Sequence, residues 1–185
     1  SASARSRAIT RKWTSRKTSG TRMVVSDSST LIHLSAIGRF ALLKDLYGKL
    51  TVPPAVWREV VEQGRDRTGV AELEAARREE WLEVRAPGYE HLLRSLQHEL
   101  DEGEAQVLAL AVEHKASLVL LDETEARRVA SLFDLEKTGA IGVLIRAKLE
   151  GRIESLRPDL DRMRTEAGFW IEGSLYEKVL QSVGE

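Results

Sequence analysis

Short apolar runs alternate with helical patterns along most of the chain, and glycine or proline marks many of the boundaries. The segments that we predict as strands are residues 23–25, 50–52, 81–85, 117–121 and 135–138. Helices are predicted at residues 31–37, 40–47, 54–63, 70–80, 89–99, 101–113, 123–132, 139–150, 157–166 and 174–183. Strands that alternate with helices predict an α/β fold, in which a parallel sheet is covered on both faces.

Two aspartates follow the two segments that most resemble buried strands. Asp27 comes directly after residues 23–26, and Asp122 comes directly after residues 118–121. Ligands of parallel sheets bind beyond the carboxyl ends of the strands, so neighbouring strands would bring both side chains into one crevice. Two carboxylates in one crevice repel each other, and one pKa rises unless a cation lies between them. Each aspartate could instead cap the helix that follows it.

Glu59 is a third candidate, because of its place on a predicted helix. It lies at the edge of an apolar face formed by Val56, Trp57, Val60 and Val61. From that border its carboxylate could reach over the core into the crevice. An ordinary surface glutamate would show the same pattern.

Glu104 is the fourth candidate and stands in the first turn of a predicted helix. Asp101 at the N-cap and Glu104 three residues later match a capping box, which requires no catalytic role. Gly103 does not suit that purpose, since glycine lowers helix propensity. A residue without a side chain there would let a metal ion, water or backbone approach closely. Both interpretations stay open.

The amino-acid composition excludes several classes of protein and of functional site. The 185 residues fit one domain, or one domain plus a tail, and 42% hydrophobic with 31% charged residues is an ordinary globular balance. The absence of cysteine excludes disulfides, thiolate zinc sites, iron–sulfur clusters and a cysteine nucleophile, and it fits a reducing cytoplasm. No apolar run approaches the roughly 18 residues of a membrane span.

The charge is divided unevenly along the chain. Residues 1–22 contain seven basic residues and no acidic one, whereas the rest contains 21 basic and 29 acidic residues, a net charge of −8. This basic leader is poor in large apolar residues, and we expect it to be disordered. It could contact nucleic acid or act as a transit peptide, or it could be extra upstream sequence before a folded part of residues 23–185.

Five segments together resemble the PIN domain family. They are residues 24–34 (VVSDSSTLIHL), 51–60 (TVPPAVWREV), 100–111 (LDEGEAQVLALA), 118–127 (LVLLDETEAR) and 138–144 (TGAIGVL). The likeness is closest to the VapC-like branch of bacteria and archaea, and it extends over residues 23–185. Each motif alone is weakly specific, but four acidic motifs in the family's order are specific together.

The resemblance implies a three-layer α/β/α fold with a parallel sheet of four to five strands in the order 3-2-1-4-5. It also implies Mg²⁺- or Mn²⁺-dependent cleavage of RNA by four acidic residues. Carried over by motif, these catalytic and metal-binding residues are Asp27, Glu59, Glu104 and Asp122. Many relatives have an aspartate where this chain has Glu104, so Asp101 or Glu123 could substitute or assist. VapC-like proteins usually act as toxins held by a small antitoxin, and often as homodimers.

The chemistry of the residues agrees with that implication. Carboxylates without histidine or cysteine suit Mg²⁺ or Mn²⁺, and two such ions about 4 Å apart can clamp the attacking and leaving oxygens of a phosphodiester. Ser28 and Ser29 could donate to a phosphate or simply cap a helix. Because residues 23–185 are acidic, neutralisation of RNA must be local. The candidate cations are Arg58, Arg127, Arg128 and Lys137, each of which could also be plain surface charge.

Two other classes of function remain open. The chain could be an inactive module that binds RNA or a partner protein, or a phosphohydrolase with Asp27 as nucleophile. The second is weaker, because no acidic residue follows Asp27 two positions on. For a partner, Ile37, Phe40 and Leu43 could form an exposed surface or belong to the core, and residues 169–171 could be a late strand or a partner-binding segment. The histidines show no ligand spacing, and we interpret them as surface or core residues.

Overall fold

The computed structural model describes residues 22–64 and 68–185. The predicted basic leader, apart from Arg22, lies outside the described residues. None of the described helices is long and apolar enough to span a membrane.

A sheet of five parallel strands forms the centre of the molecule. Its order is β3-β2-β1-β4-β5, with Val25 of β1 opposite Thr51 of β2 on one side and Val119 of β4 on the other. The strands are β1 (Val24–Ser26), β2 (Leu50–Val52), β3 (Leu82–Val84), β4 (Leu118–Leu120) and β5 (Lys137–Thr138). The strand order expected from the PIN-like motifs is therefore confirmed.

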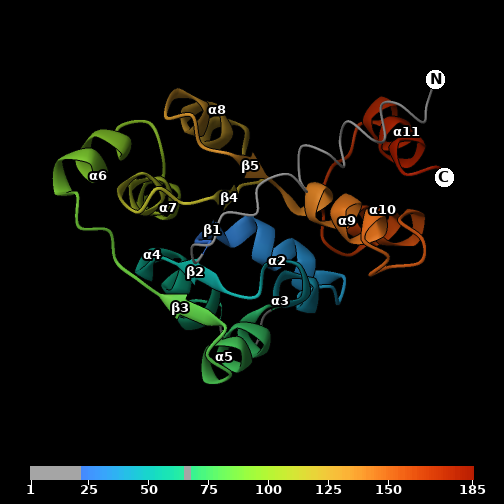
Figure 1. The fold of residues 1–185 in the computed structure, drawn as a ribbon, viewed down its shortest axis with the longest axis horizontal. Coiled ribbons are helices and arrows are strands. Elements are labelled where there is room, and N and C mark those ends of the chain that lie inside the picture. The colour runs from blue at the N-terminus through green and yellow to red at the C-terminus, as the bar shows by residue number, and fades with distance from the viewer. Residues whose placement is uncertain (1–21, 65–67) are drawn as a thin grey trace.

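Helices cover both faces of this sheet. Figure 1 shows α6 and α7 on one side of the strands and α2, α3 and α9 on the other, while α8 packs against α7. The helices are α2 (Ser28–Ala36), α3 (Ala41–Tyr47), α4 (Pro54–Trp57), α5 (Val70–Arg78), α6 (Glu90–Leu96), α7 (Glu102–Glu113), α8 (Thr124–Leu132), α9 (Ala140–Leu149), α10 (Arg157–Thr165) and α11 (Gly173–Ser182). A π-helical segment, η1 (Arg58–Glu62), continues α4. The expected three-layer α/β/α architecture is confirmed.

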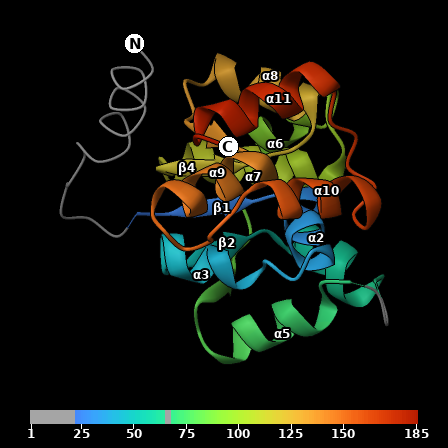
Figure 2. The ribbon, with the colours of Figure 1, turned by 90° about the vertical axis from the view of Figure 1, so that its right-hand side faces the viewer.

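The core lies between the central strands and the helices on either face. Every residue of β1 and β4 is buried, which is why these strands read as continuous apolar runs rather than alternating ones. Leu108 and Leu110 of α7 and Leu144 of α9 are fully buried in the same cluster. In Figure 2 the strands run side by side, and α2 lies at the end of β1. The packing thus fixes the strand ends, where the candidate acids lie.

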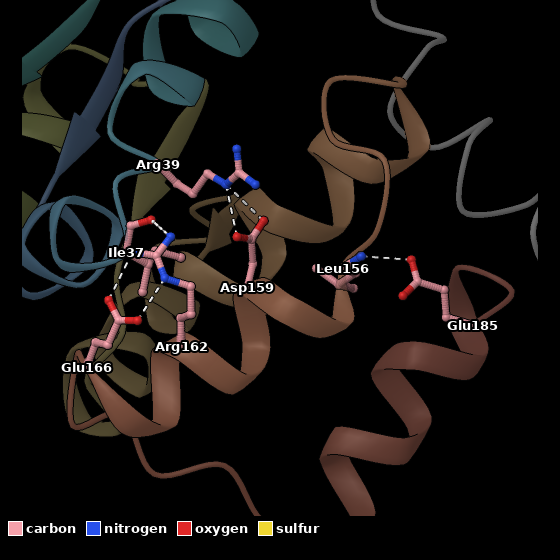
Figure 3. Close-up of polar contacts among 7 residues, drawn as sticks. All are labelled: Ile37, Arg39, Leu156, Asp159, Arg162, Glu166 and Glu185. Atoms are coloured by element: carbon pink, nitrogen blue, oxygen red, sulfur yellow. Dashed lines mark hydrogen bonds and ion pairs between the residues drawn. The ribbon is translucent and has the colours of Figure 1, made fainter.

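Polar contacts tie α10 to the end of α2, and the C-terminal residue to the start of α10 (Figure 3). Nε of Arg39, just after α2, donates to both carboxylate oxygens of Asp159 on α10, at 2.9 and 3.0 Å. Arg162 donates to the carbonyl oxygen of Ile37 at 2.6 Å, and the amide of Leu156 donates to Glu185 at 2.7 Å. Because Asp159 is almost completely buried, its ion pair is a structural contact of α10.

The structure excludes one alternative for each of the two segments considered as partner surfaces. Ile37, Phe40 and Leu43 are buried core residues, so they form no exposed surface. The segment 169–171 is not a strand but an irregular connection between α10 and α11. Within it Ile171 is buried and Trp170 is 81% exposed.

Candidate functional site

Asp27 stands between β1 and α2 and is almost completely buried. Its Oδ1 accepts a hydrogen bond from the amide of Thr30 at 2.9 Å, so it caps α2 as the sequence allowed. Its Oδ2 accepts from the amide of Asp122 at 3.1 Å. The two roles considered for Asp27 therefore coexist, since the cap also holds the carboxylate next to the second strand end.

Burial raises the pKa of Asp27 to about 7. The nearby Asp122 charge adds to this rise, while the amide hydrogen bonds from Thr30 and Asp122 oppose it. A carboxyl group with this pKa exchanges its proton near neutral pH, and a cation bound beside it would displace that proton.

Asp122 lies next to Asp27, but its carboxylate is engaged elsewhere. Oδ1 accepts a hydrogen bond from the amide of Ala140 at 2.8 Å, and Oδ2 lies 2.8 Å from Nδ1 of His33. Gly139 leaves the room for this arrangement: a Cβ atom there would lie 2.3 Å from Oδ1 of Asp122. The start of α9, with the Gly139 backbone and the Ala140 amide, therefore forms a close-fitting pocket for the Asp122 carboxylate, which we call the cradle.

Glu59 lies on η1, and its carboxylate extends to the start of α7. A Cβ atom on Gly103 would lie 3.6 Å from Oε2 of Glu59 and 3.4 Å from Oδ1 of Asp101, in ordinary van der Waals contact. The close approach of a metal ion, water or backbone that the glycine suggested is therefore not shown; the carboxylates of Asp101 and Glu59 lie beside Gly103 instead. The positive end of the α7 dipole lies at the same place and favours anions there.

Glu104 completes the capping box of α7. Its amide donates to Oδ1 of Asp101 at 2.8 Å, and its own Oε2 accepts from the Asp101 amide at 3.3 Å. Burial raises the pKa of Glu104, and the negative charges of Asp101, Glu123 and Glu125 raise it further, against the Asp101 amide bond. Glu104 thus caps its helix and also faces other carboxylates.

These strand and helix ends enclose a small acidic cavity of about 200 Å³. Its lining consists of five carboxylates and two serines: Asp27, Glu59, Asp101, Glu104, Glu123, Ser28 and Ser29. Three of the four acids carried over by motif therefore meet here, together with both possible assistants. Asp122 is not part of this lining and contacts the cavity through Asp27.

The donor set suits a hard divalent cation, since it offers only oxygen atoms. Burial and the charges of neighbouring carboxylates raise the pKa of Asp27 and of Glu104, so a bound cation would favour the ionised form of both groups. Within the described residues, no three histidine or acidic side chains are already arranged around one point in ligating geometry. A cation would therefore draw the longer glutamate side chains inward, which their rotatable bonds allow.

The arginines suggested as partners for RNA are engaged within the protein. Arg58 pairs with Glu102 at 3.2 Å, and Arg127 donates to the carbonyl oxygen of Leu121 at 2.8 Å. Arg128 pairs with Glu125 at 2.7 Å and also with Glu99. These side chains hold the helix ends around the cavity.

Sequence reasoning assigned no role to His33, yet it contacts a candidate site residue. Its ring nitrogen bonds to Asp122, and its ring packs edge-on against Phe169 at a centroid distance of 4.8 Å. No spacing rule could have found this, because His33, Asp122 and Phe169 lie far apart along the chain and meet only through the fold.

A family model described as PIN domain matches residues 23–185, which is the whole chain after the leader. No curated protein matches the chain. PIN domains are generally hydrolases of the nuclease type, and they typically use divalent metal ions. The match agrees with the strand order, and it shows that this chain belongs to the PIN domain family.

Proposed function

We propose that the protein is a Mg²⁺- or Mn²⁺-dependent endoribonuclease that hydrolyses phosphodiester bonds of RNA. The observation that carries this proposal is the cavity of about 200 Å³ in which five carboxylates meet at the carboxyl ends of the strands. Such a concentration of negative charge is unfavourable without a cation, and oxygen donors favour a hard one.

In this proposal Asp27, Glu59 and Glu104 hold the metal, and Asp122 belongs to the same site as the neighbour that fixes Asp27. Divalent ions bound there would supply an activated water and neutralise the scissile phosphate. Asp27 would give up its proton when a metal ion binds, because its pKa of about 7 lies close to neutral pH. Ser28 and Ser29, at the start of α2, would donate hydrogen bonds to a phosphate oxygen.

The biological role proposed here rests on the sequence motifs. We place the chain in the VapC-like branch, as the toxin of a type II toxin–antitoxin pair. It would act in the cytoplasm as a homodimer, and a small antitoxin protein would hold it inactive. The exposed Trp170, between α10 and α11, is the side chain we propose for contact with that partner.

A binding module without turnover is the second candidate. It is favoured by the lack of a preassembled ligand set among the described residues. A phosphohydrolase with Asp27 as nucleophile fits less well, because no acidic residue follows Asp27 two positions on.

The test is cleavage of a mixed RNA pool by the purified full chain with Mn²⁺, with Mn²⁺ plus EDTA, and in variants. We expect Asp27→Asn and Glu104→Gln to reduce the cleavage rate by about a hundredfold or more. Glu74→Gln, which changes an exposed glutamate on α5, is the matched control and should cleave normally. Cleavage that survives EDTA, or is undiminished in Asp27→Asn, contradicts the proposal, and intact RNA in every sample favours the binding module.

A further inference from the structure

We propose that His33 is a positioning residue that holds the Asp122 carboxylate out of the acidic cavity, so that Glu123 supplies the metal-facing carboxylate after β4. This inference rests on the proposed function, because it concerns the same cavity. It departs from the motif comparison, which places Asp122 among the ligands.

Both oxygens of Asp122 have fixed partners outside the cavity. The Ala140 amide holds Oδ1, and His33 holds Oδ2, each at 2.8 Å. The side chain is only 5% exposed, and the space beside Oδ1 exists because residue 139 is glycine. Turning Asp122 into the cavity would break two hydrogen bonds and leave a buried amide unpaired, which is unfavourable.

His33 is itself held in place from the C-terminal part of the chain. The ring of Phe169 meets the His33 ring edge-on, with an interplanar angle of 85°. The amide of Phe169 donates to the carbonyl oxygen of Met163 on α10 at 2.9 Å, and Met163 is fully buried. The connection after α10 therefore fixes the orientation of His33, and through it that of Asp122.

The carboxylate of Glu123, unlike that of Asp122, faces the cavity. It occupies the N-cap position of α8, but its side chain makes no capping hydrogen bond. It lines the cavity, and its charge acts on Glu104, whereas Asp122 acts on Asp27. Of the two adjacent acids after β4, Glu123 is thus the one whose carboxylate is free to approach a cation.

The arrangement gives Asp122 a different task. Its backbone amide donates to Oδ2 of Asp27 at 3.1 Å, so fixing Asp122 fixes Asp27. Supporting hydrogen bonds of this kind orient the side chains that bind a metal ion, and removing one typically lowers metal affinity or activity by about 10–100-fold.

The first test is the anomalous diffraction of crystals of the full chain soaked in Mn²⁺. We expect an oxygen of Glu123 within about 2.1 Å of a Mn²⁺ ion, while Asp122 keeps its bonds to His33 and Ala140. An Asp122 oxygen bound directly to Mn²⁺, with Glu123 turned away, overturns the inference but leaves the proposed function standing. The absence of any Mn²⁺ in the cavity overturns both.

The second test compares two variants of His33. His33→Phe keeps a ring against Phe169 but removes the donor to Asp122, whereas His33→Asn places an amide NH₂ near the position of Nδ1. Circular dichroism first establishes that both variants are folded. We expect His33→Phe to lower kcat for RNA cleavage about 10–100-fold while KM changes less than about twofold. We expect His33→Asn to recover most of the wild-type kcat. Unchanged kcat in His33→Phe, or equal losses in both variants, overturns the positioning role.

Discussion

At the scale of single residues, Asp27 combines a structural and a chemical role in one carboxylate. It caps α2, yet burial raises its pKa to about 7. For capping alone, the ionised carboxylate stabilises the helix better than the protonated one, because it is the better hydrogen-bond acceptor and interacts favourably with the helix dipole. Burial instead favours the neutral form of Asp27 up to about pH 7.

The effect of Asp27→Asn on the stability of the metal-free protein should depend on pH. The pKa of Asp27 is higher in the folded chain than its ordinary 3.8, so the metal-free fold loses stability as the pH rises from about 4 towards 7. We expect the gain in unfolding free energy of Asp27→Asn over wild type to be about 2 kcal/mol larger at pH 8 than at pH 5. Urea denaturation with EDTA at both pH values measures it, and a gain that is equal at both contradicts the assigned pKa.

Mn²⁺ binding should depend on pH for the same reason. Below pH 7 the ion must displace one proton from Asp27, so we expect the dissociation constant to rise about tenfold for each unit of pH between 6.5 and 5.5. Titrations followed by electron paramagnetic resonance measure the free ion directly. A dissociation constant that is flat over this range would show that Asp27 does not exchange a proton for the metal.

Gly139 is required by the position of Asp122 rather than by backbone strain. Its φ of −134° is open to alanine, but a methyl group there would lie 2.3 Å from Oδ1 of Asp122. We expect Gly139→Ala to lower the unfolding free energy by about 1–3 kcal/mol and to impair cleavage by displacing Asp122. Gly173→Ala, at a position where a Cβ meets no atom within 4 Å, is the control. Equal stability of the two variants would mean that the cradle is not rigid.

The sequence identified the acidic residues near the cavity, but it could not predict the direction in which each side chain points. Asp27 could be found because it ends an apolar strand, and Glu104 because it forms a capping box. The outward turn of Asp122 depends on Ala140 and His33, and the place of His33 depends on Phe169. These contacts join distant segments, and no local pattern encodes them.

At the scale of elements, the acidic residues that line the cavity lie at or near the ends of strands and helices. The apolar runs predicted β1, β2 and β4 because parallel strands buried on both faces need unbroken apolar sequence. The π-helical segment η1 was not predicted, since Val56, Trp57, Val60 and Val61 fit an ordinary α-helix equally well. Such segments frequently occur at functional sites, and this one carries Glu59.

The contact of α10 with the end of α2 is the element-scale interaction that we expect to matter most for stability. Arg39→Ala leaves the buried Asp159 without its cation, and we expect a loss of about 3–5 kcal/mol in unfolding free energy. Lys44→Ala breaks the exposed pair with Glu79 and should have no measurable effect. Guanidinium denaturation measures the unfolding free energy of both variants. Equal losses of unfolding free energy would mean that Asp159 pairs with another cation when Arg39 is removed.

At the scale of the whole molecule, charge is the unusual feature for a protein proposed to bind RNA. Residues 23–185 carry a net −8, and Arg58, Arg127 and Arg128 near the cavity are engaged in the fold. These three arginines are then less able to neutralise RNA phosphates, so we expect divalent ions in the cavity to carry much of the neutralisation.

RNA binding should therefore respond weakly to monovalent salt and strongly to divalent ions. For residues 23–185 with Ca²⁺ in place of Mg²⁺, we expect log K to fall with log[KCl] with a slope no steeper than about −2, as for two or three phosphate contacts. Removing the divalent ion should weaken binding more than tripling the KCl. Fluorescence anisotropy with a labelled oligonucleotide measures both, and a steep slope that is insensitive to EDTA would point to a basic surface instead.

The most direct measurement for the central claim is a Mn²⁺ titration of the purified full chain, followed by electron paramagnetic resonance at pH 7.5. The account predicts saturable binding that weakens at least about tenfold in Asp27→Asn and in Glu104→Gln and stays unchanged in Glu74→Gln. Absence of saturable binding, or binding that neither cavity variant weakens, would contradict a metal site formed by these carboxylates.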